Sequence, residues 1–192
     1  MLQSRIIQEV EPIYSGAQAI IYKGEIEGIG ECALKVARDT VRDANILLQE
    51  EFELSTKLSM LLPNVARYHS MVQVEGYDSL WDFERMARPT FAMDWIEGYK
   101  LSTVEALTKS RQGRFVHQKA ADQLRENLQI AYDNHFRPVD LQYFILSCDQ
   151  VLNGKEYSSG DIILFDFAEW VKEDSHVDIG YHVRELERLV QR

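Results

Sequence analysis

The apolar residues of this chain change their spacing once in the first third of the sequence, and this change constrains the fold more than any other feature. Three short runs rich in β-branched and apolar residues come first, at 13–14, 19–26 and 31–37. The last two are joined by a glycine-containing connection, which is typical of a hairpin. From 44 to 60 apolar residues recur at helical spacing, and Pro63 ends the pattern. The sequence therefore predicts a small antiparallel sheet followed by one amphipathic helix.

The remainder of the chain predicts further strands and then mostly helix. Expected strands occupy 66–74, 90–96, 143–146 and 161–167, and expected helices occupy 102–134 and 177–190. Gly98 should break the second strand, a charged segment at 109–114 should interrupt the first helix, and a turn at 153–154 should join the last two strands. This order is an α+β pattern with two lobes, which we place at 1–98 and 99–192 of one domain.

Composition narrows the classes of partner. The chain has 192 residues, 45 % of them hydrophobic, and a formal net charge of −10. An acidic protein is repelled by nucleic acid and by anionic membranes, so we expect neither as a partner. The sequence has no apolar run of 18 residues and no evident signal peptide, which favours a cytoplasmic location. Secretion without a cleaved signal, as for an effector, stays open.

The two cysteines, Cys32 and Cys148, both lie in apolar stretches, and neither has a second cysteine or a histidine nearby in the sequence. Zinc chemistry of the CxxC type is therefore unsupported. A small buried thiol is the expected state of each.

One lysine, Lys35, lies inside an apolar strand. A buried ammonium needs an anionic partner, although a lysine at a strand edge that points to solvent is the simpler alternative. A turn of small residues at 15–19 precedes this strand, and a helix with glutamates at 50, 51 and 53 follows it. Those neighbours favour the paired lysine.

Together these segments resemble the N-lobe of the protein-kinase-like superfamily, in which a glycine-rich loop covers the ATP phosphates. A strand lysine there holds the phosphates and pairs with a helix glutamate. Gly16 stands at the second glycine position of the loop, whereas Tyr14 and Ala19 stand at the first and third. The loop should therefore be stiffer than a loop with three glycines. The resemblance implies ATP contacts from Gly16, Ala17, Gln18, Ala19, Ile21, Ala33 and Lys35.

The resemblance extends to the helix glutamate and to the hinge. We choose Glu51 as the partner of Lys35, because it places more of the apolar face of the helix inward than Glu50 or Glu53 does. The strand that ends in an acidic, glycine-containing connector resembles the kinase hinge. On that resemblance Met93 is the gatekeeper, and the backbone from Asp94 to Ile96 binds the adenine edge.

The third block resembles the catalytic loop and the metal-binding motif of kinases, with departures. Asp140 fits the catalytic aspartate, and Asp166, followed by phenylalanine and alanine, fits the metal-binding motif that ends in glycine elsewhere. Pro138 and Val139 replace the usual histidine and arginine, and the asparagine five residues after the aspartate is missing. Asp166 can hold one Mg²⁺ or Mn²⁺, and Gln142, Asp149 or water would have to help with a second ion.

Two function classes follow from the resemblance. The first is an atypical minimal kinase, similar to RIO-like or bacterial effector-type kinases, that transfers the γ-phosphoryl of ATP to Ser or Thr of a protein. The 26 residues after Asp166 leave little room for a complete C-lobe, which suggests the minimal type. The second class is a pseudokinase that binds nucleotide or protein without turnover. The four charged residues Lys35, Glu51, Asp140 and Asp166 favour activity, and the missing asparagine favours the pseudokinase.

Overall fold

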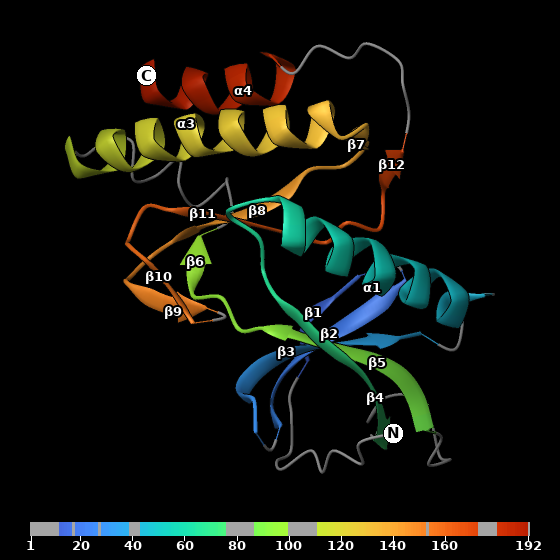
Figure 1. Cartoon of the computed structure of the whole chain (residues 1–192). Helices are drawn as coiled ribbons and strands as arrows, with labels where there is room; N and C mark the ends of the chain where they lie inside the picture. The colour runs from blue at the N-terminus through green and yellow to red at the C-terminus, as the bar shows by residue number, and fades with distance from the viewer. Residues whose placement is uncertain are drawn as a thin grey trace. The chain divides into compact units, whose positions relative to one another are not determined.

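The structure is a computed structural model of the whole chain (Figure 1), in which residues 12–16, 18–26, 28–38, 43–75, 87–99, 111–152, 154–172 and 180–191 are described. The fold is α+β, and the chain divides into two compact units. The first unit comprises Met1–Glu53 and Arg67–Trp95, and the second comprises Leu54–Ala66 and Ile96–Arg192.

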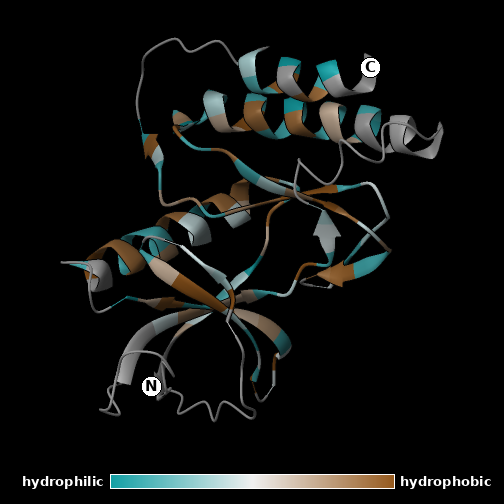
Figure 2. Cartoon of the chain, turned by 180° about the vertical axis from the view of Figure 1, so that it is seen from behind, coloured by the Kyte–Doolittle hydropathy of each residue, from teal (hydrophilic) through white to brown (hydrophobic). Residues whose placement is uncertain are grey.

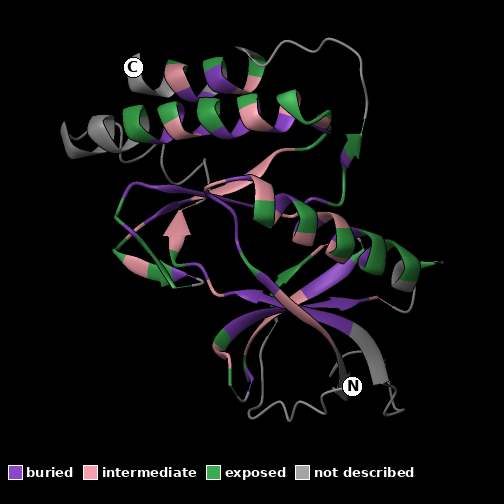
Figure 3. Cartoon of the chain, in the orientation of Figure 1, coloured by how far each residue is buried: buried purple, intermediate pink, exposed green. Residues whose placement is uncertain are grey.

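The first unit is built on a five-stranded antiparallel sheet in the order β1-β2-β3-β5-β4. Its strands are β1 (Pro12–Ser15), β2 (Ala19–Ile26), β3 (Gly30–Ala37), β4 (Tyr68–Glu75) and β5 (Ala87–Asp94). The central strand β3 is buried from Cys32 onward on both of its faces, as the purple ribbon of Figure 3 shows. A strand that is buried on both faces carries a nearly continuous apolar run, and the sequence of β3 provides one.

Helix α1 (Ala44–Leu61) follows β3, as its apolar spacing predicts. Asp43 precedes it with φ of 62°, and its carbonyl accepts the N–H groups of Ile46 and Leu47. The helix presents Phe52 to the sheet, where its ring lies 6.0 Å from that of the fully buried Phe91. Tyr68 of β4 contacts the same ring at 5.2 Å. Aromatic contacts therefore join α1 to the middle of the sheet.

Among the residues that the structure describes, the second unit contains the end of α1 and the helices α3 (Arg111–Asp133) and α4 (Gly180–Gln191), which pack against each other. The predicted apolar face of α3 is confirmed, because Ala121, Leu124, Leu128 and Ala131 are all fully buried. In Figure 2 this face is visible as brown segments along α3. The predicted interruption at 109–114 is wrong from residue 111 onward. Gly113 costs the helix about 1 kcal/mol, which the long apolar face outweighs.

Short strands complete the second unit. They are β6 (Gly98–Tyr99), β7 (Phe136–Pro138), β8 (Gln142–Leu146), β9 (Gln150–Leu152), β10 (Lys155–Tyr157), β11 (Ile162–Phe165) and β12 (Trp170–Lys172). They form an antiparallel sheet β11-β8-β6 and the two-stranded pairs β10-β9 and β12-β7. The predicted strands 143–146 and 161–167 correspond to β8 and β11, which do pair. The turn predicted to join them joins β9 to β10 instead, and this hairpin lies between β8 and β11 in the sequence.

Gly98 begins β6 instead of only ending a strand, which corrects the expectation for this residue. A Cβ atom at Gly98 would lie 2.7 Å from the carbonyl oxygen of Ile145 and 2.9 Å from the Cβ of Phe144. Only glycine lets β6 approach β8 this closely. The preceding strand β5 ends at Asp94 and not at residue 96.

The two cysteines differ in exposure, and both are free thiols. Cys32 is fully buried as expected, and burial together with the charges of Asp94 and Glu25 raises its pKa to about 11. The prediction for Cys148 is wrong, because it is exposed in the turn after β8 and its thiol donates to the carboxylate of Glu97. The apolar strand β8 ends at Leu146, two residues before Cys148. None of the helices among the described residues is long and apolar enough to cross a membrane.

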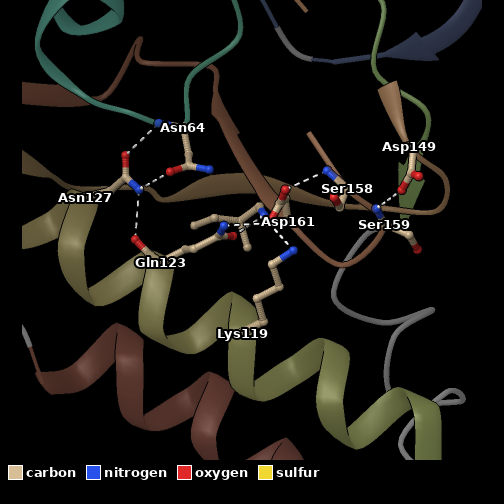
Figure 4. A network of polar contacts seen from close by, with 9 residues as sticks. Asn64, Lys119, Gln123, Asn127, Asp149, Ser158, Ser159 and Asp161 are labelled. Atoms are coloured by element: carbon tan, nitrogen blue, oxygen red, sulfur yellow. Dashed lines mark hydrogen bonds and ion pairs between the residues drawn. The ribbon is translucent and has the colours of Figure 1, made fainter. Parts of the chain in front are cut away.

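A polar network anchors the interior of the second unit (Figure 4). The buried carboxylate of Asp161 accepts Lys119 Nζ at 2.7 Å, Gln123 Nε2 at 2.6 Å and the Ser158 N–H at 2.7 Å. Gln123 in turn accepts the N–H of Ile162 at 2.9 Å, which fixes the start of β11 against α3. Burial acts to raise the pKa of Asp161, but the Lys119 ammonium and these hydrogen bonds outweigh it and lower the pKa below 3.8.

This network makes the stability of the second unit depend on pH. Because the folded-state pKa of Asp161 is depressed, its carboxylate stabilises the fold above about pH 3.8 and loses that effect as the pH falls further. Asp161→Asn should lower the free energy of unfolding by about 2 kcal/mol at pH 6, and the difference from wild type should shrink below pH 3.8. Urea denaturation of both proteins at pH 6 and below pH 3.8 measures the two free energies of unfolding. Glu156→Gln, an exposed change on β10, should have an effect below about 0.5 kcal/mol.

Candidate functional site

Lys35 of β3 and Glu51 of α1 form a buried ion pair within the first unit. The Lys35 Nζ lies 2.8 Å from Oε1 and 2.7 Å from Oε2 of Glu51. Only 8 % of Lys35 and 4 % of Glu51 are exposed. The structure thus brings together the lysine and the glutamate that the sequence selected, and Glu50 and Glu53 are exposed instead.

A buried aromatic ring lies beside this pair. The Lys35 ammonium lies 5.7 Å from the ring centroid of Phe91, which is fully buried on the neighbouring strand β5. Removing two charges from water costs several kcal/mol per ion, and a pair of apolar side chains would often be as stable. The pair is therefore better explained by a need for an ammonium at a fixed position than by a need for stability.

The predicted loop residues lie between β1 and β2. The Gly16 N–H donates to the carbonyl of Ala19 at 3.0 Å, which closes a tight turn, and Gln18 is exposed. Ala17 lies outside the described residues. In the sheet that follows, Ile21 stands opposite Lys35, and the buried Ala33 stands opposite Met93.

At the predicted hinge, Met93 and Asp94 are buried at the end of β5, and Ile96 is buried at the start of the second unit's last segment. The Asp94 carboxylate accepts the Arg67 N–H at 2.8 Å and contacts His69 Nε2 at 2.8 Å. Its side chain is therefore engaged with β4 and the residue before it. The side chain of His69 is only 13 % exposed. No sequence signal marks this contact, because it depends on the register of β4 and β5.

The second unit carries the two predicted aspartates. Asp140 is exposed after β7, and the side-chain amide of Gln142 donates to its carboxylate. Asp166 is half-buried directly after β11 and has φ of 57°. The next residue, Phe167, is fully buried and packs edge-on against Trp170 at 5.1 Å.

The backbone of Asp166 is unusual. Among described residues other than glycine, Asp43 and His135 also have positive φ. Asp43 directly precedes α1, and His135 follows α3, where a left-handed residue commonly ends a helix. Asp166 is not at a helix end. A left-handed aspartate costs on the order of 1 kcal/mol, and such strain is concentrated at functional sites.

The residues present fit one magnesium ion in part. Carboxylate oxygen is the donor that Mg²⁺ prefers, and Mg²⁺ at nucleotide sites is usually bound by one or two carboxylates together with phosphate oxygens and water. Asp166 supplies one such carboxylate. In the described part of the chain, no group of three or more His, Cys, Asp or Glu side chains could hold a metal without such help.

Phe144 and Ile145 lie where the resemblance would place the missing asparagine; both are in β8, and Ile145 is fully buried. Of the two substitutes considered, Gln142 donates to Asp140, and Asp149 accepts the Ser159 N–H at 2.8 Å. Both side chains are therefore engaged in contacts that do not involve Asp166.

A histidine not predicted to interact with Asp140 is electrostatically coupled to it. Burial lowers the pKa of His182 of α4, and the negative charge of Asp140 opposes this shift. This interaction could not be predicted from the sequence, because it depends on how α4 packs in the second unit.

The comparison with solved structures shows the fold. No family model matches the sequence, and no curated protein matches it. A twitchin kinase fragment from C. elegans, described as autoregulated protein kinase and immunoglobulin domains, matches with a TM-score of 0.58 and 14 % identity over 88 % of this chain and 33 % of that one. The kinase domain of PF14_0431 matches with a TM-score of 0.56 and 11 % identity over 92 % and 53 %. The chain has a protein-kinase-like fold and spans at most about half the length of these two structures.

The buried ion pair predicts non-additive effects on stability. Lys35→Met and Glu51→Leu should each lower the free energy of unfolding by about 3 kcal/mol, because each leaves one buried charge without the ion-pair partner that it has in the wild type. The double variant should be more stable than either single variant, since it leaves no such charge. Urea denaturation of the four proteins gives the cycle.

The control for this cycle is Lys23→Met in the same sheet. Lys23 pairs with Glu31 at 3.0 Å, but the two side chains are 36 % and 63 % exposed. Its loss should cost less than about 1 kcal/mol. Purely additive losses at Lys35 and Glu51 would contradict the assignment of a desolvated pair.

Proposed function

We propose that this protein is an atypical protein kinase that binds ATP and transfers its γ-phosphoryl group to a serine or threonine of a protein. The buried Lys35–Glu51 pair carries this proposal, because it is costly to desolvate and holds an ammonium at a fixed place on the sheet. The kinase-like fold supports it. The RIO-like or effector-type subtype and the cytoplasmic location stay predictions.

The charge of the chain makes this ammonium important. With a net charge of −10, the protein as a whole repels a nucleoside triphosphate. Binding therefore requires local positive charge, and Lys35 supplies it from the first unit. Glu51 contacts the ammonium with both oxygens, which fixes its position before the phosphates arrive.

The second unit supplies the carboxylates for the transfer step. Asp140, held by the amide of Gln142, accepts the proton of the substrate hydroxyl while that oxygen forms a bond to the γ-phosphorus. The bond between the γ-phosphorus and the β–γ bridging oxygen breaks, and ADP leaves with that oxygen. Asp166 would hold Mg²⁺, which when bound neutralises charge on the phosphate oxygens.

A nucleotide-binding pseudokinase is the second candidate, and specific observations favour it. Ile145 leaves no polar group at the usual position of the second metal ligand. Gly16 donates its N–H to Ala19, so that donor is engaged within the loop. The missing second metal ligand would weaken phosphoryl transfer more than nucleotide binding, and the engaged Gly16 N–H leaves one loop donor fewer for the phosphates.

Radiolabelled ATP separates the two candidates. Purified protein is incubated with γ-labelled ATP, Mg²⁺ or Mn²⁺, and casein or histone, and ATP binding is followed by thermal shift. Asp140→Asn should lose about 100-fold or more of the label transfer and keep the ATP-dependent shift. Lys35→Met should lose both, while its circular dichroism shows that it is folded. Lys57→Met, an exposed change on α1 with the same change in charge, should behave as wild type.

The possible results separate the two proposals. Transfer that is lost in Asp140→Asn and Asp166→Asn supports the kinase. An ATP-dependent shift without any transfer supports the pseudokinase. Absence of a shift in the wild type contradicts ATP binding and therefore both.

A further inference from the structure

Arg38, the residue after β3, is bonded to the turn between β1 and β2. It is half-buried, and its Nε donates to the carbonyl of Gly16 at 2.8 Å. Its Nη2 donates to the hydroxyl of Ser15, and its backbone N–H donates to the carbonyl of Gln18 at 3.0 Å. One residue thus holds three positions of the turn.

These contacts fix the orientation of the turn as well as its position. The guanidinium is planar, so two donors that point to neighbouring residues define an angle as well as a distance. The N–H of Gly16 closes the turn on Ala19 at 3.0 Å. A Cβ atom at Gly16 would lie 3.3 Å from the Ala19 carbonyl oxygen and 3.3 Å from the Tyr14 ring, so little space is left. The turn is therefore tightly constrained on two sides.

Arg38 directly follows the strand that carries Lys35, the proposed phosphate-binding lysine. Lys35 lies in β3, and Arg38 follows three residues later, a spacing of about 10 Å in extended chain. Because β3 is the buried centre of the sheet, its position is well defined by its neighbours. The turn is therefore placed relative to Lys35 through Arg38.

We propose that Arg38 is a positioning residue that holds Gly16, Gln18 and Ala19 ready to cover the phosphates of the nucleotide. This inference rests on the proposed function. A loop that must be ordered by its ligand lowers the affinity, and a loop ordered beforehand does not. The contacts of Arg38 order this turn before the nucleotide binds.

The proposal makes the phosphates, and not the nucleoside, the sensitive part of the ligand. Affinities of the wild type, Arg38→Met and Arg38→Lys for ATP and for adenosine are measured by calorimetry. Arg38→Met should bind ATP about 10-fold more weakly and adenosine within about 2-fold of wild type. A general structural defect would weaken both ligands.

Arg38→Lys separates the anchor from charge alone. Lysine keeps the charge but has no planar fork, so it cannot bond Gly16 and Ser15 in the same way. We expect its ATP affinity to lie within about 3-fold of that of Arg38→Met. The control is Lys57→Met, which changes the net charge in the same way far from the turn in sequence and should bind ATP as wild type does.

The outcomes are distinct. ATP affinity that is unchanged in Arg38→Met, or fully restored in Arg38→Lys, overturns the positioning role and leaves the proposed function intact. An equal loss for ATP and adenosine also overturns it. A wild type that binds neither ligand removes the proposed function and this inference together.

Discussion

The ion pair between Lys35 and Glu51 is the interaction on which the interpretation of this protein depends. It is almost fully removed from water, it uses both carboxylate oxygens, and it stands against the buried ring of Phe91. Such a pair contributes little net stability, since its attraction mainly offsets the cost of desolvation. It does fix where a positive charge stands. The strand that carries the ammonium, β3, is the central strand of the five-stranded sheet.

Further hydrogen bonds of charged side chains connect the strands and the turn of the first unit. Asp94 engages Arg67 and His69, which ties the end of β5 to β4. Arg38 ties the turn before β2 to the end of β3. Hydrogen bonds to charged groups, which are stronger than neutral ones, thus hold the end of the strand next to β3 and the residue that follows β3.

The sequence predicted the elements of the first unit well, because their apolar spacing is strong and local. β2 and β3 follow from runs of apolar and β-branched residues, α1 follows from helical spacing, and the choice of Glu51 follows from the apolar face of α1. Contacts that depend on register or tertiary packing could not be predicted. His69 meets Asp94 only when β4 and β5 pair in one register, and Arg38 reaches Gly16 only when the turn folds back. Strands of two or three residues, such as β6 and β7, are too short to show a period.

The different surroundings of the two cysteines give the chain a built-in reporter position. Cys32 is buried and its pKa is about 11, so it holds almost no thiolate at neutral pH. Cys148 is exposed beside Glu97, whose carbonyl also accepts the Ser147 N–H and the Gln150 amide. A thiol-directed fluorophore would therefore attach at one defined place without any substitution. Its emission would follow the segment between the hinge and β8 in the natural sequence.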